Sequence, residues 1–218
     1  MLDFLSTYPH LVENIILATR YTIIISLVSA LLGLVLGTLL ALGKSSKLWF
    51  IRLFVTAYTD LFRGTPVILQ VSIVYFVVFG GLNVNPLLAA IVSLSLNSSA
   101  YISEIMRAGI QNVDKGQIEA ARAMGVSEKD IAIDITIPQA IRKTMPPIIN
   151  EIATLVKESS IVYIIGVSDI MFVTNRTIAK TYMYFEPLII AGLCYYLLVK
   201  LITYLGKYLE VKLSYDKH

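Results

Sequence analysis

The sequence predicts an all-α integral membrane protein. Hydrophobic residues make up 56% of the 218-residue chain and charged residues only 15%, whereas a soluble domain carries about 25% charged residues. The mean hydropathy is +0.74, and several apolar runs approach the ~20 residues that a helix needs to cross a bilayer. We therefore expect a multi-pass membrane protein in which residues 1–218 form one transmembrane domain.

The rest of the composition argues against several other classes. The net charge of +3 is too small to indicate a nucleic-acid partner. The one cysteine, Cys194, lies within an apolar run, so the sequence offers neither a disulfide framework nor a cysteine-based metal site. We expect no bound metal.

Five segments are long enough, or nearly so, to cross a hydrocarbon core of ~30 Å as helices. The third begins with Pro86, a residue favoured in the first turn of a helix, and the fourth is the most polar. The five are residues 15–43, 55–80, 86–110, 146–167 and 186–209.

The basic residues predict the orientation, because cytoplasmic loops are rich in Lys and Arg. Basic clusters follow the first, third and fifth predicted spans, whereas the loops after the second and fourth contain none or few. The N-terminus is therefore expected outside and the C-terminus in the cytoplasm. The residues before the first span are acidic rather than basic, so we expect no cleaved signal peptide.

Gly43, Lys44 and Ser45 resemble the end of a phosphate-binding loop, but that motif needs a glycine where this chain has Thr38. The stretch also ends a predicted membrane helix instead of joining a strand to a helix. We expect that the chain itself binds no ATP and no other cofactor.

Gly33 and Gly37 form a G-x-x-x-G pattern in the first predicted span. Such a pattern lets two helices approach closely. Packing within the chain and contact with a second chain are both compatible with it.

A polar segment, residues 114–138, interrupts the apolar chain on the expected cytoplasmic side. Asp114 can cap a first short helix, which Gly125 ends. Ser127 can cap a second short helix, and Pro138 closes the segment and can open the next helix. Small residues at the elbow between them allow close approach of a partner. The residues alone leave two interpretations open: a helix held in a partner's groove, or an amphipathic hairpin at the membrane surface.

A spacing within this segment resembles the cytoplasmic EAA motif of ABC importer permeases: Glu-Ala-Ala, three residues, Gly, nine residues, and Ile-x-x-Pro. Longer stretches such as FRGTPVILQ and LVKESSIVYIIGVSDI are similar to the bacterial polar amino-acid importer permeases, and the resemblance covers nearly the whole chain. One departure is Glu158, where members often have Asp. The motif positions, expected to couple to an ATPase, are Glu119, Ala120, Ala121, Gly125, Ile135 and Pro138.

The resemblance implies a type I ABC importer permease of the bacterial inner membrane, with five transmembrane helices and a cytoplasmic coupling helix. Such a chain is not an enzyme, because ATP and Mg²⁺ are bound by two separate cytosolic ATPase subunits. The other implied partners are a second permease chain, the same or similar, an extracytoplasmic binding protein, the amino-acid substrate and the lipid bilayer.

Polar residues in the third and fourth predicted spans form one stripe on each helix. Charged groups in spanning helices are costly and usually face a cavity or one another. The stripes therefore predict a pocket for a zwitterion or a cation, with mutual pairing as the alternative. Two acidic stripes favour a basic amino acid (arginine, histidine or lysine), and glutamine stays open. The candidate substrate-binding residues are Ser93, Asn97, Tyr101, Glu104, Glu151, Thr154 and Glu158.

Four further polar residues fit structural or gating roles. Asp60 and Arg63 are expected to pair, with Arg63 reaching toward the cytoplasmic surface, and Lys157 and Ser159 flank the second stripe. An ion-coupled secondary transporter and a membrane scaffold for a cytosolic partner are the alternative functions. The first is disfavoured because no internal repeat is visible.

Overall fold

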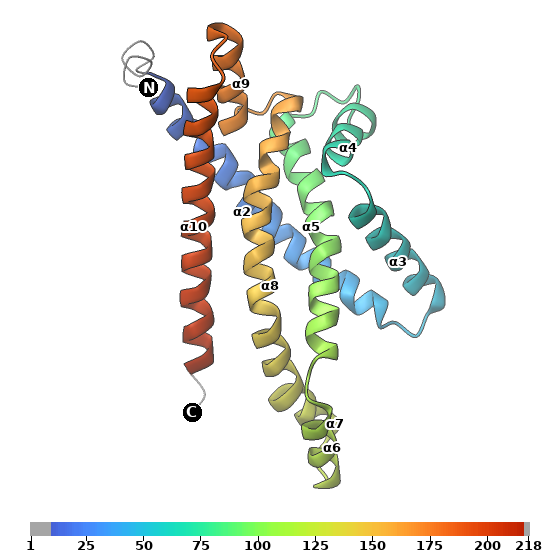
Figure 1. The fold of residues 1–218 in the computed structure, drawn as a ribbon. Coiled ribbons are helices and arrows are strands. Elements are labelled where there is room, and N and C mark those ends of the chain that lie inside the picture. Colours follow the sequence, from blue (N-terminus) through green and yellow to red (C-terminus); the bar gives the residue numbers. More distant parts are fainter. Residues whose placement is uncertain (1–9, 216–218) are drawn as a thin grey trace.

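The computed structural model describes residues 10–215, and every regular element in this range is helical. Helices α5, α8 and α10 run roughly side by side, with α8 between the other two, and α2 crosses them obliquely (Figure 1). In chain order the elements are α2 (His10–Lys44), α3 (Trp49–Gly64), α4 (Val67–Ser72), the π-helical η1 (Ile73–Val78), α5 (Pro86–Gln111), α6 (Lys115–Ala123), α7 (Glu128–Asp130), the π-helical η2 (Ile131–Thr136), α8 (Ile137–Glu158), the 3₁₀ helix η3 (Ser159–Ile165), α9 (Ile170–Thr181) and α10 (Phe185–Tyr215).

The crossing of α2 over α5 depends on the two glycines of the G-x-x-x-G pattern. A Cβ atom added at Gly33 would lie 2.9 Å from the Cβ of Ser98, and one added at Gly37 would lie 2.8 Å from the Cβ of Ile102. Real Cβ atoms essentially never come so close, so α5 occupies the space that a side chain would fill. Of the two interpretations of this pattern, packing within the chain is therefore the one that the structure confirms.

The buried core joins the ends of several helices. Ile25 of α2, Val71 of α4 and Leu94 of α5 pack with Leu155 of α8 and Val162 of η3, and all five side chains are fully buried. This cluster fixes the short α4 and η3 against the long helices, at the end of the molecule away from α6 and α7 (Figure 1).

Length and composition single out α2, α5 and α10 as helices able to cross a membrane, and one bent pair of helices meets the same criterion only when its two parts are taken together. The pair is Trp49–Gly64 and Val67–Val78, bent by 109°, so the expectation of one continuous second span is wrong. Thr65 has extended backbone angles (φ −122°, ψ 150°), because the residue before a proline, here Pro66, is driven out of the helical region.

The fourth predicted span also differs from expectation. Its helix α8 begins at Ile137, nine residues before the predicted start, and continues through Pro146 and Pro147. It ends at Glu158, where the chain tightens into η3. Hydrophobic composition alone does not mark α8 as a membrane helix.

The polar segment projects from one end of the bundle as α6, α7 and η2 (Figure 1). The caps at Asp114 and Ser127 are confirmed: each side chain accepts a backbone N–H, from Gly116 and Asp130 respectively. Pro138, expected to close this segment and to open the next helix, lies in the first turn of α8, which follows the π-helical turn η2 without a break. Such a turn already interrupts the regular backbone ladder, so a proline directly after it is tolerated.

At the opposite end of the molecule, near the first described residues, lies α9 (Figure 1). The sequence analysis expected only a loop there. Asp169 caps this helix by accepting the backbone N–H of Phe172 at 2.8 Å, and it also accepts the hydroxyl of Tyr195 at 3.1 Å. The same buried carboxylate therefore starts α9 and ties it to α10.

Candidate functional site

The elbow between α6 and α7 is set by a helix-ending motif. Gly125 adopts a left-handed backbone angle (φ +79°). Its N–H donates to the carbonyl of Arg122 at 2.9 Å, and the N–H of Val126 donates to the carbonyl of Ala121 at 3.1 Å. These two bonds close the end of the helix in the Schellman pattern, which favours glycine at this place. The turn is therefore built from the local sequence.

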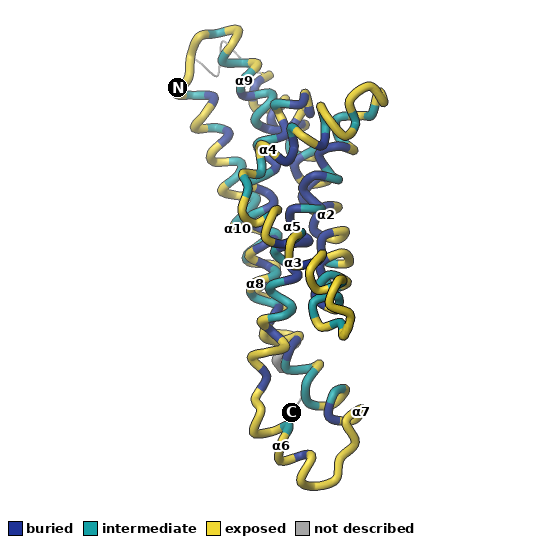
Figure 2. Tube along the Cα trace, turned by 90° about the vertical axis from the view of Figure 1, so that its right-hand side faces the viewer, coloured by how far each residue is buried: buried dark blue, intermediate teal, exposed yellow. Residues whose placement is uncertain are grey.

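The elbow presents an exposed surface beyond the end of the bundle (Figure 2). Glu119, Ala120 and Gly125 are exposed, and the Met124 side chain is 84% exposed. The remaining motif positions face inward: Ala121 is buried, and Ile135 and Pro138 are half-buried. The EAA-type pattern thus divides into residues that pack inward and residues that are exposed on the surface.

An ion pair braces the elbow from outside. Nη2 of Arg122 in α6 donates to Oε2 of Glu128 in α7 at 2.9 Å. The hydrogen bond and charge of Arg122 hold the pKa of the Glu128 carboxyl below its usual range, and the same contact raises the pKa of the Arg122 guanidinium. Both groups are fully exposed, so the pair orients the two short helices more than it stabilises the fold.

Asn97 lies at the bend between α3 and α4. Its side chain is 1% exposed and donates to Oε1 of Gln70 at 2.9 Å. Gln70 in turn donates from Nε2 to the carbonyls of Phe62, at 2.8 Å, and Thr65, at 3.0 Å. The two amides therefore satisfy backbone carbonyls that the break in the helix leaves unpaired.

The other α5 residues of the predicted stripe have separate surroundings. The hydroxyl of Ser93 is buried and donates to the carbonyl of Ala89 in its own helix at 2.7 Å. Tyr101 is half-buried, and the Arg63 guanidinium lies 5.7 Å from the centre of its ring, within the range of a cation–π contact.

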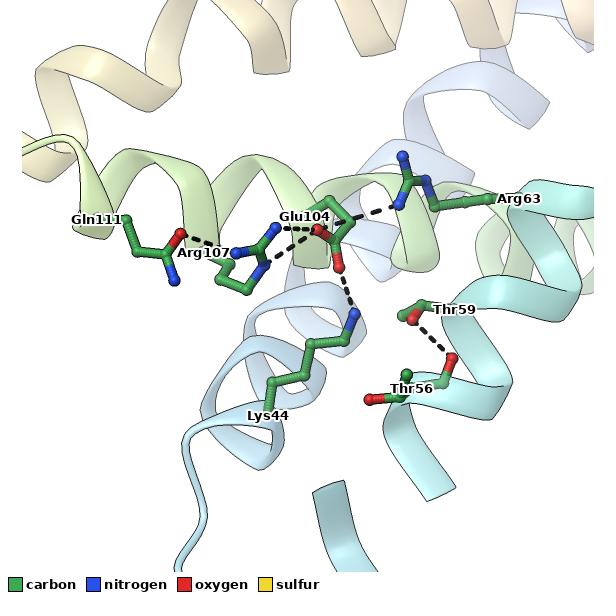
Figure 3. A network of polar contacts seen from close by, with 7 residues as sticks. All are labelled: Lys44, Thr56, Thr59, Arg63, Glu104, Arg107 and Gln111. Atoms are coloured by element: carbon green, nitrogen blue, oxygen red, sulfur yellow. Dashed lines mark hydrogen bonds and ion pairs between the residues drawn. The ribbon is translucent and has the colours of Figure 1, made fainter. Parts of the chain in front are cut away.

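Glu104 is surrounded by three cations of the same chain (Figure 3). Lys44, at the end of α2, donates to one carboxylate oxygen. Nη2 of Arg107, one turn along α5, lies 2.7 Å from the other, and Nη1 of Arg63 in α3 lies 4.0 Å from it. This charge cluster joins α2, α3 and α5. Its contacts favour mutual pairing over direct substrate contact for Glu104, whose substrate-binding role stays a prediction.

The polar stripe of α8 differs from Glu104 in its surroundings. The Glu151 side chain is 9% exposed and approaches the hydroxyl of Ser98 in α5, and Thr154 and Glu158 are half-buried. Among the described residues, the ion pairs include neither Glu151 nor Glu158. The stripe thus holds a buried carboxyl group at Glu151 and a half-buried one at Glu158, neither of them ion-paired within the described part of the chain.

The expected Asp60–Arg63 pair does not form, and Lys157 and Ser159 have separate surroundings. Asp60 and Arg63 are both exposed and make no ion pair with each other, since Arg63 points to Glu104 instead. Both residues lie on α3, and the Arg63 guanidinium reaches Tyr101 and Glu104 of α5. Lys157 is exposed, and Ser159 is buried and donates to the carbonyl of Val156, which mends the backbone where α8 changes to η3.

Sequence reasoning missed Gln70, Lys44 and Arg107 as members of these networks. Arg107 is readable from its i, i+3 spacing to Glu104, and Gln70 could have been suspected as a buried amide beside the Thr65–Pro66 break. Lys44 lies 60 residues from Glu104 in sequence, and no local pattern connects the two.

The comparison with protein families gives the decisive observation for this helical chain. The model of the family described as "Binding-protein-dependent transport system inner membrane component" matches residues 30–215. The chain belongs to this family. As a binding-protein-dependent transport component it is a multi-pass inner-membrane subunit of an ABC importer, and it is the permease rather than the ATPase.

Two curated relatives of the binding-protein-dependent family extend over nearly the whole chain. The arginine transport system permease protein ArtQ of Bacillus subtilis (strain 168) is 47% identical over 98% of each chain. A putative glutamine transport system permease protein GlnP of Rickettsia typhi is 41% identical, over 98% of this chain and 99% of the relative.

Solved structures of transport-system membrane subunits have the same fold. A crystal structure of an amino acid ABC transporter with histidines has a chain 33% identical to this one, with a TM-score of 0.83 over 97% of both chains. A chain from inward-facing conformations of the MetNI methionine ABC transporter is 21% identical, with a TM-score of 0.71 over 91% of this chain and 95% of that one. At this low identity, the second match supports the fold alone.

Proposed function

We propose that this permease forms the translocation path for a polar amino acid, either a basic one (arginine, histidine or lysine) or glutamine. The carrying observation is the pair of shielded carboxyl groups at Glu151 and Glu158, which have no cationic partner among the described ion pairs. A charge shielded within helices is costly unless paired, and a cationic or zwitterionic substrate supplies the missing charge. The names of the arginine and glutamine relatives support this substrate class.

The path we propose is lined from α5 and α8. Its candidate substrate-binding residues are the polar side chains of both stripes, with the α8 carboxyls as cation acceptors and the α5 amide and hydroxyl groups around them. The internal contacts of Asn97 and Glu104 give these two an indirect role, in which they hold the shape of the helices beside the path.

For the membrane arrangement we propose one domain with five crossings: α2, the bent α3–α4–η1 unit, α5, α8 and α10. The polar α8 counts as a crossing because it packs between α5 and α10, both of which are long and apolar (Figure 1). With the basic clusters on the cytoplasmic side, the N-terminus lies outside and the C-terminus inside.

The coupling partner we propose is a cytosolic ABC ATPase that grips the elbow of α6 and α7. Two permease chains, two ATPase chains and an extracytoplasmic binding protein make up the working unit, with ATP and Mg²⁺ bound by the ATPases and no cofactor by this chain. The exposed elbow at the end of the bundle supports this arrangement (Figure 2), and closure of the ATPase pair then alternates the access of the path.

A competition experiment tests the substrate class. The permease, reconstituted in proteoliposomes with its ATPase and binding protein, takes up labelled arginine, and unlabelled arginine, histidine, lysine and glutamine compete in turn. We expect competition by basic amino acids or glutamine, and an uptake at least tenfold weaker in Glu151→Gln. Thr181→Ser, which keeps a hydroxyl at an α9 position outside the path, is the matched control. Competition only by apolar amino acids would refute the substrate class.

A further inference from the structure

A groove at the end of the molecule opposite the coupling elbow has the character of an anion site. It lies between the first turns of α2 and the helix α9, has a volume of about 440 Å³, and is open to the surface. Arg20 enters it from α2, and Arg176 and Lys180 enter it from α9. Neither a carboxylate nor any other acidic side chain lines it.

The three cations of this groove are not neutralised by described neighbours. Arg20 contacts only the adjacent Tyr21, as a hydrogen bond of 3.3 Å and a stacked guanidinium, and the ion pairs among residues 10–212 include none of the three. The acids nearest in sequence to these cations are Glu13, Asp169 and Glu186, and none of them lines the groove. Glu13 pairs with His10, and Asp169 bonds to Phe172 and Tyr195. Within residues 10–212, the groove therefore concentrates three positive charges without an ion-paired carboxylate.

Neutral hydrogen-bonding groups and an apolar wall complete the groove. Asn14 and Thr177 supply polar side chains, whereas Leu17 and Phe172 supply apolar surface. Leu17 is 52% exposed, and the same helix continues into exposed apolar residues such as Ile24 and Leu31. An anion held by the cations would thus lie directly above a surface suited to hydrocarbon chains, as at the boundary of a membrane.

We propose that this groove binds the phosphodiester headgroup of an anionic phospholipid in the leaflet opposite the coupling elbow. Basic pockets between membrane helices are suited to such headgroups, and guanidinium groups recognise phosphate oxygens through paired N–H donors. The bound lipid adds polar contacts between the start of α2 and α9, which already pack together through Leu11, Ile15 and Ile170. The adjoining apolar strip favours a lipid over an acidic peptide as the occupant.

The test measures lipid retained by the purified full-length chain. The chain is incorporated into nanodiscs that contain phosphatidylglycerol and phosphatidylcholine in known proportion, and the enrichment of each lipid is determined by native mass spectrometry. The variant carries Arg20→Gln, Arg176→Gln and Lys180→Gln. Each removed cation near a membrane surface weakens anionic lipid binding about fivefold, so enrichment of phosphatidylglycerol should fall by at least tenfold.

Two control variants separate the groove from general charge and from folding. Lys47→Gln, Lys207→Gln and Lys212→Gln together remove the same charge from exposed positions outside the groove, and this chain should keep its preference for phosphatidylglycerol. Arg20→Lys with Arg176→Lys keeps the charge of the groove and should retain most of the enrichment. Circular dichroism and gel filtration establish that each variant is folded.

Several outcomes overturn the proposal. Equal loss in the groove and control variants would show unspecific attraction, and full enrichment in the groove variant would show that the groove is not the site. Binding of inorganic phosphate that depends on the three cations, without any preference for phosphatidylglycerol, would mean that a free anion is the ligand. Displacement of the lipid by an acidic peptide but not by excess phosphatidylglycerol would identify a protein occupant.

Discussion

The side-chain amide of Asn97 in α5 donates to Oε1 of Gln70 in α4 at 2.9 Å. Gln70 in turn donates to the carbonyls of Phe62 and Thr65. Two buried amides therefore support the 109° bend. A helix broken inside a membrane must find partners for its freed backbone groups. This pair provides them, and it fixes the bent unit to α5.

Replacing Gln70 by leucine tests this role. The change keeps the volume but leaves the Thr65 carbonyl without its amide donor and the Asn97 amide with only a long contact, of 3.4 Å, to the Phe62 carbonyl. An unpaired buried group costs about 1–3 kcal/mol. We expect a clearly lower melting midpoint of the purified chain in detergent. Ser72→Ala removes an exposed hydroxyl that bonds only within α4 and should leave the midpoint nearly unchanged. Equal midpoints for wild type and Gln70→Leu would disprove the bracing role.

The Glu104 cluster is expected to behave as a structural unit. Glu104→Gln leaves Lys44, whose side chain is 13% exposed, without its carboxylate, and breaking a buried pair costs about 3–5 kcal/mol. The double change of Glu104→Met with Lys44→Met should be less harmful than Glu104→Met alone. Stability and uptake of both a basic amino acid and glutamine are measured for each variant. A selective loss of the basic amino acid would instead place Glu104 in contact with substrate.

The close α2–α5 crossing predicts that replacement by alanine destabilises the protein at Gly37 but not at Gly192. Gly37→Ala places a methyl group against Ile102 and the carbonyl of Ser99, and such overpacking costs about 1–3 kcal/mol. Gly192→Ala in α10 meets nothing within 4 Å, so the better helix propensity of alanine makes it neutral or slightly stabilising. Thermal unfolding of both variants provides the measurement. An unchanged midpoint for Gly37→Ala would show that the helices can separate at no cost.

The sequence predicted the elements whose signals are local. Apolar length marks α2, α5 and α10, and the capping residues Asp114 and Ser127 with Gly125 give the elbow its shape. Relationships between distant residues were not predictable in this way. The bend depends on Thr65 before Pro66 and on an amide from another helix, and α8 is too polar to be delimited by hydropathy.

In the candidate site, too, local patterns were predictable and long-range contacts were not. The expected coupling positions lie close together in sequence, and the structure places them on α6, the turn at Gly125, η2 and the start of α8. The polar stripe of α5, in contrast, is separated by its neighbours: Asn97 turns to Gln70, and Glu104 turns to Lys44, which is 60 residues away. Helical spacing predicts which residues share a face, but it carries no information about what packs on that face.

We expect the elbow at Gly125 to transmit ATP hydrolysis to transport, and one matched pair of variants tests this coupling. Gly125→Asn and Gly125→Asp have nearly the same shape, and a Cβ at this position meets nothing within 4 Å in the chain itself. Asparagine is tolerated at left-handed angles such as this one, and aspartate differs from it mainly by its charge.

The measurement is ATP hydrolysis and amino-acid uptake in the same proteoliposomes, which contain the permease, its ATPase and its binding protein. We expect Gly125→Asn to keep most of the uptake. Gly125→Asp should lose at least tenfold of the uptake per ATP hydrolysed, because a charge is forced against the ATPase groove, while the permease remains in the membrane. Normal uptake per ATP in Gly125→Asp would contradict the account.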